Sequence, residues 1–179
     1  MNMYFIAQVL PPHLNEQVLQ WKWLMQERYG CKVALKSPAH ITLVPPFWLD
    51  EQFEAALVQD TNTVVAGVAA FTIITNGFSA FKPRTIFIAV EPNAHLDALK
   101  KKVDDFFAGK EAYKVKLDRR PFHPHITIAT RDLHKKTFAE AWPLFETKAF
   151  KEKWTADSIS ILRHNKKNWE VFHMATFIS

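Results

Sequence analysis

The 179-residue chain is poor in residues that several common kinds of site require. Cys31 is its only cysteine, so no disulfide can form within the chain and no zinc site can rest on several thiolates. A lone cysteine also favours a reducing, cytoplasmic location. With only four glycines, the chain has no glycine-rich phosphate loop. Mechanisms that depend on such a loop, including those of nucleoside triphosphates and dinucleotides, are therefore disfavoured.

Long apolar runs and a targeting segment are also missing. No run approaches the roughly 20 residues that a membrane helix needs. Residues 1–10 have no basic leading region and no small-residue cleavage site, so we expect no signal peptide. The 48% hydrophobic and 23% charged fractions are typical of a folded protein. The net charge of +5 suits an anionic substrate and is equally compatible with a role in solubility alone.

The hydrophobic pattern predicts a single domain over residues 1–179 in which strands and helices interleave. Predicted strands cover residues 3–10, 31–36, 40–44, 68–75, 85–90, 125–130, and a hairpin that begins near 159, turns at 165–168 and returns over 169–178. Predicted helices cover residues 14–25, the segment after Asp50, 96–106 and 138–145. This order favours an α+β fold with antiparallel sheets over a doubly wound parallel sheet.

One short pattern occurs twice. The first copy is Ser37-Pro38-Ala39-His40-Ile41-Thr42-Leu43, and the second is Phe122-His123-Pro124-His125-Ile126-Thr127-Ile128. Each copy contains His-apolar-Thr-apolar, with a proline one or two residues before the histidine. The two histidines lie 85 residues apart, close to half the chain. One tetrad carries little information, but two with the same flanking proline indicate a duplicated functional element.

Both tetrads fall in predicted strands, where residues i and i+2 point to the same face. His40 and Thr42 would therefore share one face, while the apolar residues between and after them turn to the core. His125 and Thr127 repeat this arrangement. If the two strands belong to related lobes that face one cleft, two imidazoles and two hydroxyls converge there.

This set of groups suits phosphoryl transfer. An in-line displacement needs a base on one side of phosphorus and an acid on the other, and histidine titrates near pH 7. Threonine hydroxyls can donate to the non-bridging oxygens and hold the phosphate. We therefore predict His40 and His125 as the catalytic pair and Thr42 and Thr127 as phosphate-binding residues, with no metal and no cofactor.

Two simpler interpretations compete with this one. A histidine on a half-buried strand is more often structural than catalytic, and threonine is a common strand former. Neither tendency explains why the same tetrad occurs twice. A zinc site is the other alternative, because His123 and His125 form His-x-His and His40 could join them. No Asp, Glu or Cys lies nearby in the sequence to complete such a site.

The paired tetrads resemble the two signature motifs of the two-histidine (2H) phosphoesterase superfamily, and residues 121–129 are especially similar to its 2′-5′ RNA ligase and cyclic phosphodiesterase branch. The resemblance covers most of the chain. It implies a two-lobed, pseudo-twofold fold in which antiparallel sheets line a central cleft and helices pack outside. It also implies metal-independent action on 2′,3′-cyclic phosphates or 2′-5′ linkages of nucleotides or RNA ends, with reversible ligation. His40 and His125 would be the acid–base pair, with Thr42 and Thr127 as phosphate anchors.

Four further residues are weaker candidates for substrate binding. Arg84 begins a predicted strand and could meet a phosphate, while Phe47 follows the first tetrad and could stack on a base. His123 and Arg131 flank the second tetrad and could steer an anion. Ordinary surface or core packing is the alternative for each of them.

Two other functions stay open. The chain could be a non-catalytic RNA- or nucleotide-binding module of the same fold, although binding alone does not need two titratable groups. It could also be a metal-dependent hydrolase, whose activity a chelator would remove. The expected partner in the leading interpretation is an RNA end or a nucleotide, and we expect a monomer with no obligate protein partner and no membrane contact.

Overall fold

The computed structural model describes all 179 residues, and its strands and helices alternate along the chain. The strands are β1 (Asn2–Val9), β2 (His40–Leu49), β3 (Phe71–Phe81), β4 (Thr85–Val90), β5 (His125–Ala129), β6 (Lys153–Ala156), β7 (Ser158–His164) and β8 (Trp169–Thr176). The helices are α1 (Pro12–Tyr29), α2 (Glu54–Val65), α3 (Ala94–Ala108) and α4 (Lys135–Ala141). Four short 3-10 turns are η1 (Val33–Lys36), η2 (Glu51–Phe53), η3 (Glu111–Tyr113) and η4 (Trp142–Leu144).

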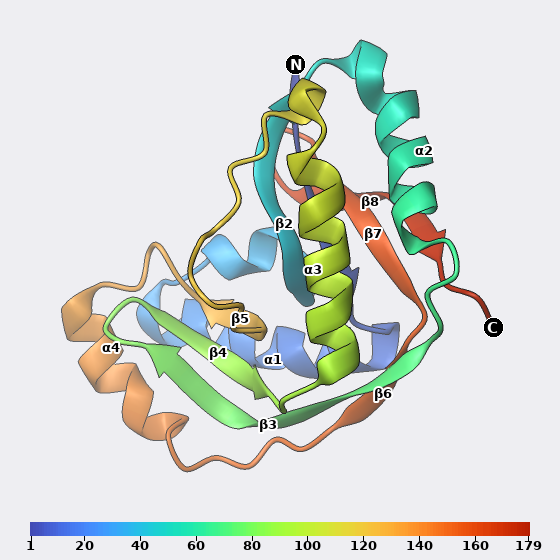
Figure 1. Cartoon of the computed structure of the whole chain (residues 1–179). Coiled ribbons are helices and arrows are strands. Elements are labelled where there is room, and N and C mark those ends of the chain that lie inside the picture. The colour runs from blue at the N-terminus through green and yellow to red at the C-terminus, as the bar shows by residue number, and fades with distance from the viewer.

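The strands form two four-stranded sheets, with strand orders β2-β1-β7-β8 and β5-β4-β3-β6. Every pairing between these strands is antiparallel. Figure 1 shows the second sheet below the first, with α3 running along β2. The predicted α+β class with antiparallel sheets is confirmed.

The two sheets contain the same strand–helix–strand unit. In one sheet β1, α1 and β2 follow each other, and in the other sheet β4, α3 and β5 do so. β2 and β5 are each an edge strand of their sheet, and each begins with its tetrad histidine. The helix of each unit packs against the edge strand of the other sheet, since α1 contacts β5 and α3 contacts β2. The two edge strands also contact each other. The repeated motif thus corresponds to a pseudo-twofold arrangement of the fold.

Burial along the two edge strands follows the predicted alternation. Ile41 and Leu43 are at most 1% exposed, as are Ile126 and Ile128, while the histidines and threonines between them are only partly buried. Buried residues from both sheets and from the helices form one hydrophobic cluster of 39 residues. The apolar half of each tetrad therefore anchors the strand and leaves the polar half on the opposite face.

Helix ends follow the sequence signals closely. Gly30 ends α1 in the left-handed conformation at φ 70°, and its N–H donates to the Gln26 carbonyl at 2.8 Å. The Asp50 carboxylate accepts from the Gln52 N–H at 3.1 Å and caps the turn that leads into α2. None of the helices is long and apolar enough to cross a lipid bilayer.

Two predicted features are corrected by the structure, and one strand was missed. Residues 31–36 do not form a strand, because Val33–Lys36 is the 3-10 turn η1. The pair Pro45-Pro46 does not end the strand that begins at His40, which continues to Leu49. An edge strand tolerates proline because its outer side has no partner that needs the missing N–H. β6 was not predicted, since four residues give too short a pattern to recognise.

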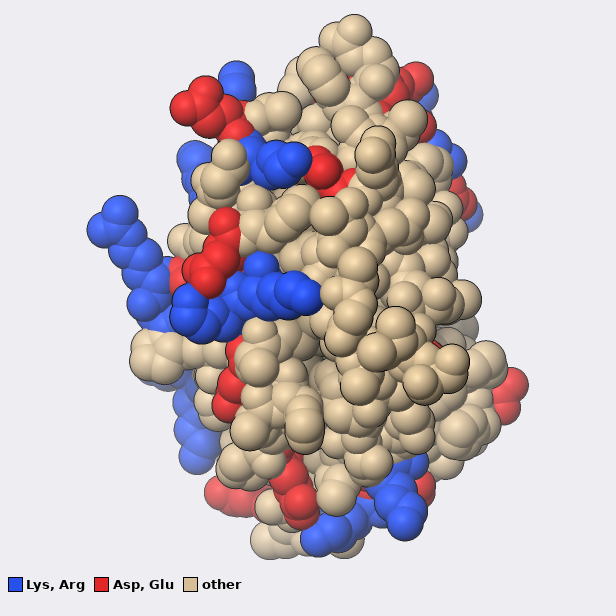
Figure 2. All heavy atoms as spheres, turned by 45° about the vertical axis from the view of Figure 1, so that its right-hand side comes forward, with Lys and Arg blue, Asp and Glu red and all other residues tan.

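Charged side chains are mixed on the face shown in Figure 2, where Lys and Arg lie beside Asp and Glu. A broad area to the right of the centre of this face carries neither sign. Some pairs are local, such as Lys100–Asp104 at 2.5 Å and Lys101–Asp105 at 2.6 Å on α3. The positive net charge is therefore not spread as a uniform basic layer over this face.

Candidate active site

Each tetrad histidine bonds to the backbone carbonyl two residues before it. The Nδ1 of His40 lies 2.7 Å from the Pro38 carbonyl oxygen, and the Nδ1 of His125 lies 2.7 Å from the His123 carbonyl oxygen. A carbonyl oxygen can only accept, so Nδ1 carries the hydrogen in both rings. Nε2 is consequently the nitrogen left for proton exchange with a ligand.

Apolar surroundings favour the neutral form of both imidazoles. The His40 ring lies 4.9 Å from the ring of Phe5, and the His125 ring lies 5.1 Å from Phe81 and 5.2 Å from Phe87. Burial lowers the pKa of His40 to about 4, against the opposing effect of its hydrogen bond to Pro38. Burial also lowers the pKa of His125. The positive charge of Lys22 and, to a smaller extent, that of His125 lower the His40 pKa further.

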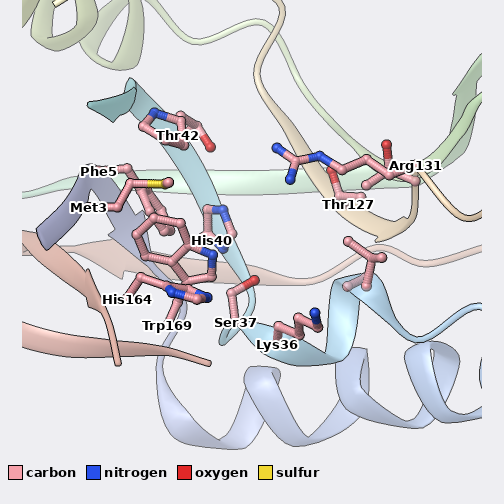
Figure 3. Close-up of a pocket in the computed structure, with 14 residues that line it drawn as sticks. Met3, Phe5, Lys36, Ser37, His40, Thr42, Thr127, Arg131, His164 and Trp169 are labelled. Atoms are coloured by element: carbon pink, nitrogen blue, oxygen red, sulfur yellow. The ribbon is translucent and has the colours of Figure 1, made fainter. Parts of the chain in front are cut away.

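A cavity of about 360 Å³ opens beside His40. The lining residues come from β1, η1, β2, β5 with the loop after it, and the β7–β8 hairpin. They are Met3, Phe5, Val33, Ala34, Lys36, Ser37, His40, Thr42, Pro46, Thr127, Thr130, Arg131, His164 and Trp169. Figure 3 shows Arg131 reaching from the β5 side toward Thr42, with Thr127 beside it. The cavity therefore combines two imidazoles, several hydroxyls and two cations and contains no carboxylate, a lining that suits an anion.

The structure gathers four of the predicted site residues around this cavity, namely His40, Thr42, Thr127 and Arg131. His125 is not among the lining residues. It stands two positions before Thr127 on the same face of β5, with its ring packed on Phe81 and Phe87.

Two weaker candidates lie outside the first cavity. Arg84 lines a neighbouring cavity. The ring of His123 packs edge-on against Phe81 at 5.2 Å and against Phe87 at 5.6 Å, while its carbonyl oxygen receives the His125 Nδ1–H. The observed contribution of His123 to the site is thus its carbonyl oxygen.

The predicted base-stacking role of Phe47 is corrected by the structure. Phe47 is 5% exposed and packs between Tyr4 and Tyr113, with ring centroids 6.2 Å and 6.0 Å away. Phe47 stands an even number of positions after Ile41 and Leu43, so the alternation of the strand places it on their core-facing side and places Pro46 on the side of His40. Phe47 therefore turns into the core, and Pro46 lines the cavity instead.

Several lining residues could not be recognised from the sequence. The rings of Phe5, Trp169 and His164 form a series, with 4.7 Å between Phe5 and Trp169 and 4.9 Å between Trp169 and His164. These residues come from three strands that meet only through sheet pairing. The only local signal was the aromatic content of β1, which equally predicts a core strand.

The segment before His40 is fastened to α1 at several points. The buried Lys22 ammonium donates to the Ser37 carbonyl at 2.9 Å, and the Ala39 N–H donates to Asn15 Oδ1 at 2.7 Å. Burial lowers the pKa of Lys22 to about 8. These bonds fix the Pro38 carbonyl that selects the tautomer of His40.

Potential metal ligands do not cluster in the molecule. No group of three or more His, Cys, Asp or Glu side chains is placed to hold a metal ion. The His-x-His pair of residues 123 and 125 has its rings against Phe81 and Phe87.

Comparison with known families agrees with this geometry. The family model described as the 2′-5′ RNA ligase superfamily matches residues 10–168. The chain belongs to the 2′-5′ RNA ligase superfamily. This confirms the resemblance to the 2H phosphoesterases that the tetrads indicated, and it supports a phosphoesterase activity for this chain.

Relatives in this superfamily cover most of the chain. A Geobacillus kaustophilus protein named "Putative phosphoesterase" is 31% identical over 157 residues, covering 86% of this chain and 84% of its own length. A protein of the same name from a Geobacillus species, strain WCH70, is 28% identical over 151 residues and 82% of each chain. Both matches extend well beyond the two tetrads.

Solved structures share the fold at low sequence identity. E. coli LigT complexed with 3′-AMP superposes with a TM-score of 0.69 at 18% identity, covering 99% of each chain. The protein TT0787 of Thermus thermophilus superposes with a TM-score of 0.67 at 19% identity, covering 99% of this chain and 98% of its own. These likenesses establish a LigT-like architecture for the whole chain.

Proposed function

We propose that this chain is a metal-independent phosphodiesterase that opens 2′,3′-cyclic phosphates or 2′-5′ linkages of nucleotides or RNA ends, with 2′-5′ ligation as the reverse reaction. The observation that supports this most strongly is the matched pair of histidines. His40 and His125 begin edge strands that contact each other, and each is held by the carbonyl two residues before it. Two imidazoles with Nε2 available on related strands suit acid–base chemistry at one phosphate.

In hydrolysis of a 2′,3′-cyclic phosphate, we assign the base to His40. With a pKa of about 4 its imidazole is neutral at pH 7, so Nε2 can take a proton from water as the water oxygen bonds to phosphorus. The bond from phosphorus to one ribose oxygen breaks, and His125 gives that oxygen a proton. An anionic substrate raises the pKa of a nearby imidazole, which favours a protonated His125 in the complex. In ligation a 5′-hydroxyl takes the place of the attacking water, so His40 and His125 keep these roles, and cleavage of the 2′-5′ linkage exchanges them.

The remaining polar groups hold the phosphate. Thr42 and Thr127 share strand faces with the two histidines, and their hydroxyls can donate to non-bridging oxygens. The Arg131 guanidinium supplies a fixed positive charge at the same cavity. Together these groups would stabilise the charge that builds on phosphorus-bound oxygens during displacement.

The aromatic part of the cavity lining suits a nucleoside base. The ring series of Phe5, Trp169 and His164 forms an aromatic wall beside His40, and bases stack on such surfaces without strong sequence preference. The capture of 3′-AMP by E. coli LigT, which shares this fold, is consistent with a nucleotide as ligand. We therefore expect a nucleotide with its phosphate between β2 and β5.

Turnover in the presence of a chelator tests the proposed function. The protein is incubated with EDTA and 2′,3′-cyclic AMP, a 2′-5′ dinucleotide, or RNA with a cyclic phosphate end, and products are resolved by chromatography and phosphorus NMR. We expect a nucleoside monophosphate from the cyclic nucleotide. Nucleotide binding without turnover of any substrate would indicate a binding module, and activity that EDTA removes would indicate a metal-dependent enzyme.

A further inference from the structure

A second cavity, of about 500 Å³, adjoins the one beside His40. It is bounded by the turn between β3 and β4, the first residue of β4, the loop after β5 and the start of α4. Its polar lining consists of Arg84, Thr85, Thr130, Arg131, His134 and Lys135. Thr130 and Arg131 line the first cavity as well. The two cavities therefore share a wall.

The lining of the second cavity is positively charged and contains no carboxylate. Arg84, Arg131 and Lys135 take part in none of the ion pairs of the protein. This differs from the face in Figure 2, where cations lie beside acidic residues. Uncompensated cations from three separate segments around one hollow attract an anion, and a guanidinium matches phosphate oxygens in shape.

The backbone at Arg131 is held in a costly conformation on the wall between the cavities. Its φ of 59° lies in the left-handed region, which is strained for a non-glycine residue. The next residue secures the turn, because the Asp132 carboxylate accepts from the N–H groups of Lys32 at 2.7 Å and Val33 at 3.0 Å. Arg131 is thus kept where it can serve a ligand in either cavity.

A hydroxyl pair completes the second cavity. The Oγ1 atoms of Thr85 and Thr130 lie 3.0 Å apart, so one hydroxyl donates to the other. The accepting hydroxyl keeps its own hydrogen for a ligand oxygen. The second cavity thus offers cations and a threonine donor, as the first cavity does. It has no pair of histidines comparable to His40 and His125.

We propose that the second cavity binds the phosphate that joins the terminal nucleotide to the rest of an RNA chain, while the first cavity holds the reacting phosphate. This inference rests on the proposed function. Successive phosphates of one strand would occupy adjoining cavities, with Arg131 between them. The substrate class it selects is an oligonucleotide end in preference to a free mononucleotide.

Equilibrium binding of unreactive probes tests the second cavity without relying on turnover. The probes are adenosine 3′-phosphate, a diadenosine dinucleotide with a 3′-phosphate, and the same dinucleotide with an uncharged methylphosphonate linkage. Calorimetry should give at least a tenfold smaller Kd for the charged dinucleotide than for the other two. Its log Kd should also depend more steeply on log salt, by about 0.7 for one added phosphate contact.

Variants then locate this effect. The double variant Arg84→Ala/Lys135→Ala should lose most of the preference for the charged dinucleotide. Lys136→Ala removes the exposed neighbouring cation on α4 that does not line the cavity, and it should keep the preference.

The contradicting outcomes are distinct from those of the proposed function. Equal binding of all three probes, or a preference that survives the double variant, would refute the second site. If the methylphosphonate dinucleotide also bound more tightly than adenosine 3′-phosphate, the gain in affinity would come from the added nucleoside instead of the added phosphate. Turnover of 2′,3′-cyclic AMP does not need the second cavity, so hydrolysis without a dinucleotide preference refutes only this inference. A dinucleotide preference without any turnover refutes only the catalytic proposal.

Discussion

His40 illustrates how packing sets the protonation state of a single side chain. Its Nδ1–H is fixed on the Pro38 carbonyl, its ring lies on Phe5, and burial lowers its pKa to about 4 from an ordinary value near 6.5. Because the imidazole pKa is lower in the folded state, the unfolded chain binds a proton between about pH 4 and pH 6.5 that the folded chain does not bind. This stabilising contribution is complete above pH 6.5 and is lost as the pH falls toward 4.

The pH dependence of stability therefore reports on His40. Relative to the variant His40→Asn, the wild type should lose roughly 1–2 kcal/mol of unfolding free energy between pH 6.5 and pH 4. Asparagine does not titrate and can still donate to the Pro38 carbonyl. Urea unfolding at several pH values gives the difference, and a difference that does not change with pH would show that the His40 pKa is not depressed.

The threonine hydroxyls make a separate residue-scale prediction. Thr42→Val and Thr127→Val keep the side-chain shape and remove the donor, so each should lower kcat/KM for a cyclic nucleotide by about 10²-fold. Thr42→Ser and Thr127→Ser retain the hydroxyl and should keep most of the activity. Valine variants with wild-type kinetics and unchanged circular dichroism would remove the phosphate-anchoring role.

At the scale of elements, α1 supports the segment that precedes His40. Lys22 is 2% exposed and its ammonium donates to the Ser37 carbonyl. Burial lowers its pKa to about 8 from 10.5. The folded state therefore binds fewer protons than the unfolded state between these values, so the wild type gains stability from this group as the pH rises from 8 to 10.5.

A comparison with Lys22→Met isolates this effect from the other groups that titrate at high pH. The unfolding free energy of the wild type minus that of Lys22→Met should rise by roughly 1–3 kcal/mol between pH 8 and pH 10. The exposed residue Lys136 provides the control, because Lys136→Met should give no such slope. A flat difference for Lys22→Met would mean that Lys22 is not buried as a charged group.

The elements that were predictable are those with long or sharply bounded patterns. Gly30 marked the end of α1, and the predicted strand over residues 85–90 coincides with β4. The segment 31–36 was wrongly predicted as a strand because six residues do not separate a strand from a 3-10 turn. The continuation of β2 through Pro45 depends on its edge position, which only the assembled sheet determines.

At the scale of the whole molecule, both sheets share one core. The 39-residue cluster includes Ile6 and Ile41 from one sheet and Ile88 and Ile126 from the other. The Trp154 Nε1–H of β6 also donates to Gln8 Oε1 of β1 at 3.2 Å, which links the sheets by a buried polar contact. The two sheets should therefore be stable only together.

This shared core predicts one cooperative unfolding transition. Far-ultraviolet circular dichroism and tryptophan fluorescence should give the same midpoint in urea, because neither sheet retains a core without the other. Two separated transitions would show that the lobes fold independently and would contradict a single domain over residues 1–179.

The site itself was partly predictable at this scale. The duplicated tetrad and the geometry of a strand were sufficient to predict that His40, Thr42 and Thr127 lie together, and all three line the first cavity. Sheet pairing brings together Phe5 and Trp169, which lie near opposite ends of the sequence. No local sequence pattern predicts a contact between residues so far apart. The same limit applies to the second cavity, where Arg84 and Lys135 converge from separate segments.

The most direct test of the account is single-turnover hydrolysis of 2′,3′-cyclic AMP by His40→Ala and His125→Ala with EDTA present. Each variant should remain folded and lose roughly 10²–10⁴-fold in rate, and the double variant should lose little more than the poorer single variant, because the two groups act on one phosphate. A single variant that keeps the wild-type rate would contradict the paired acid–base mechanism.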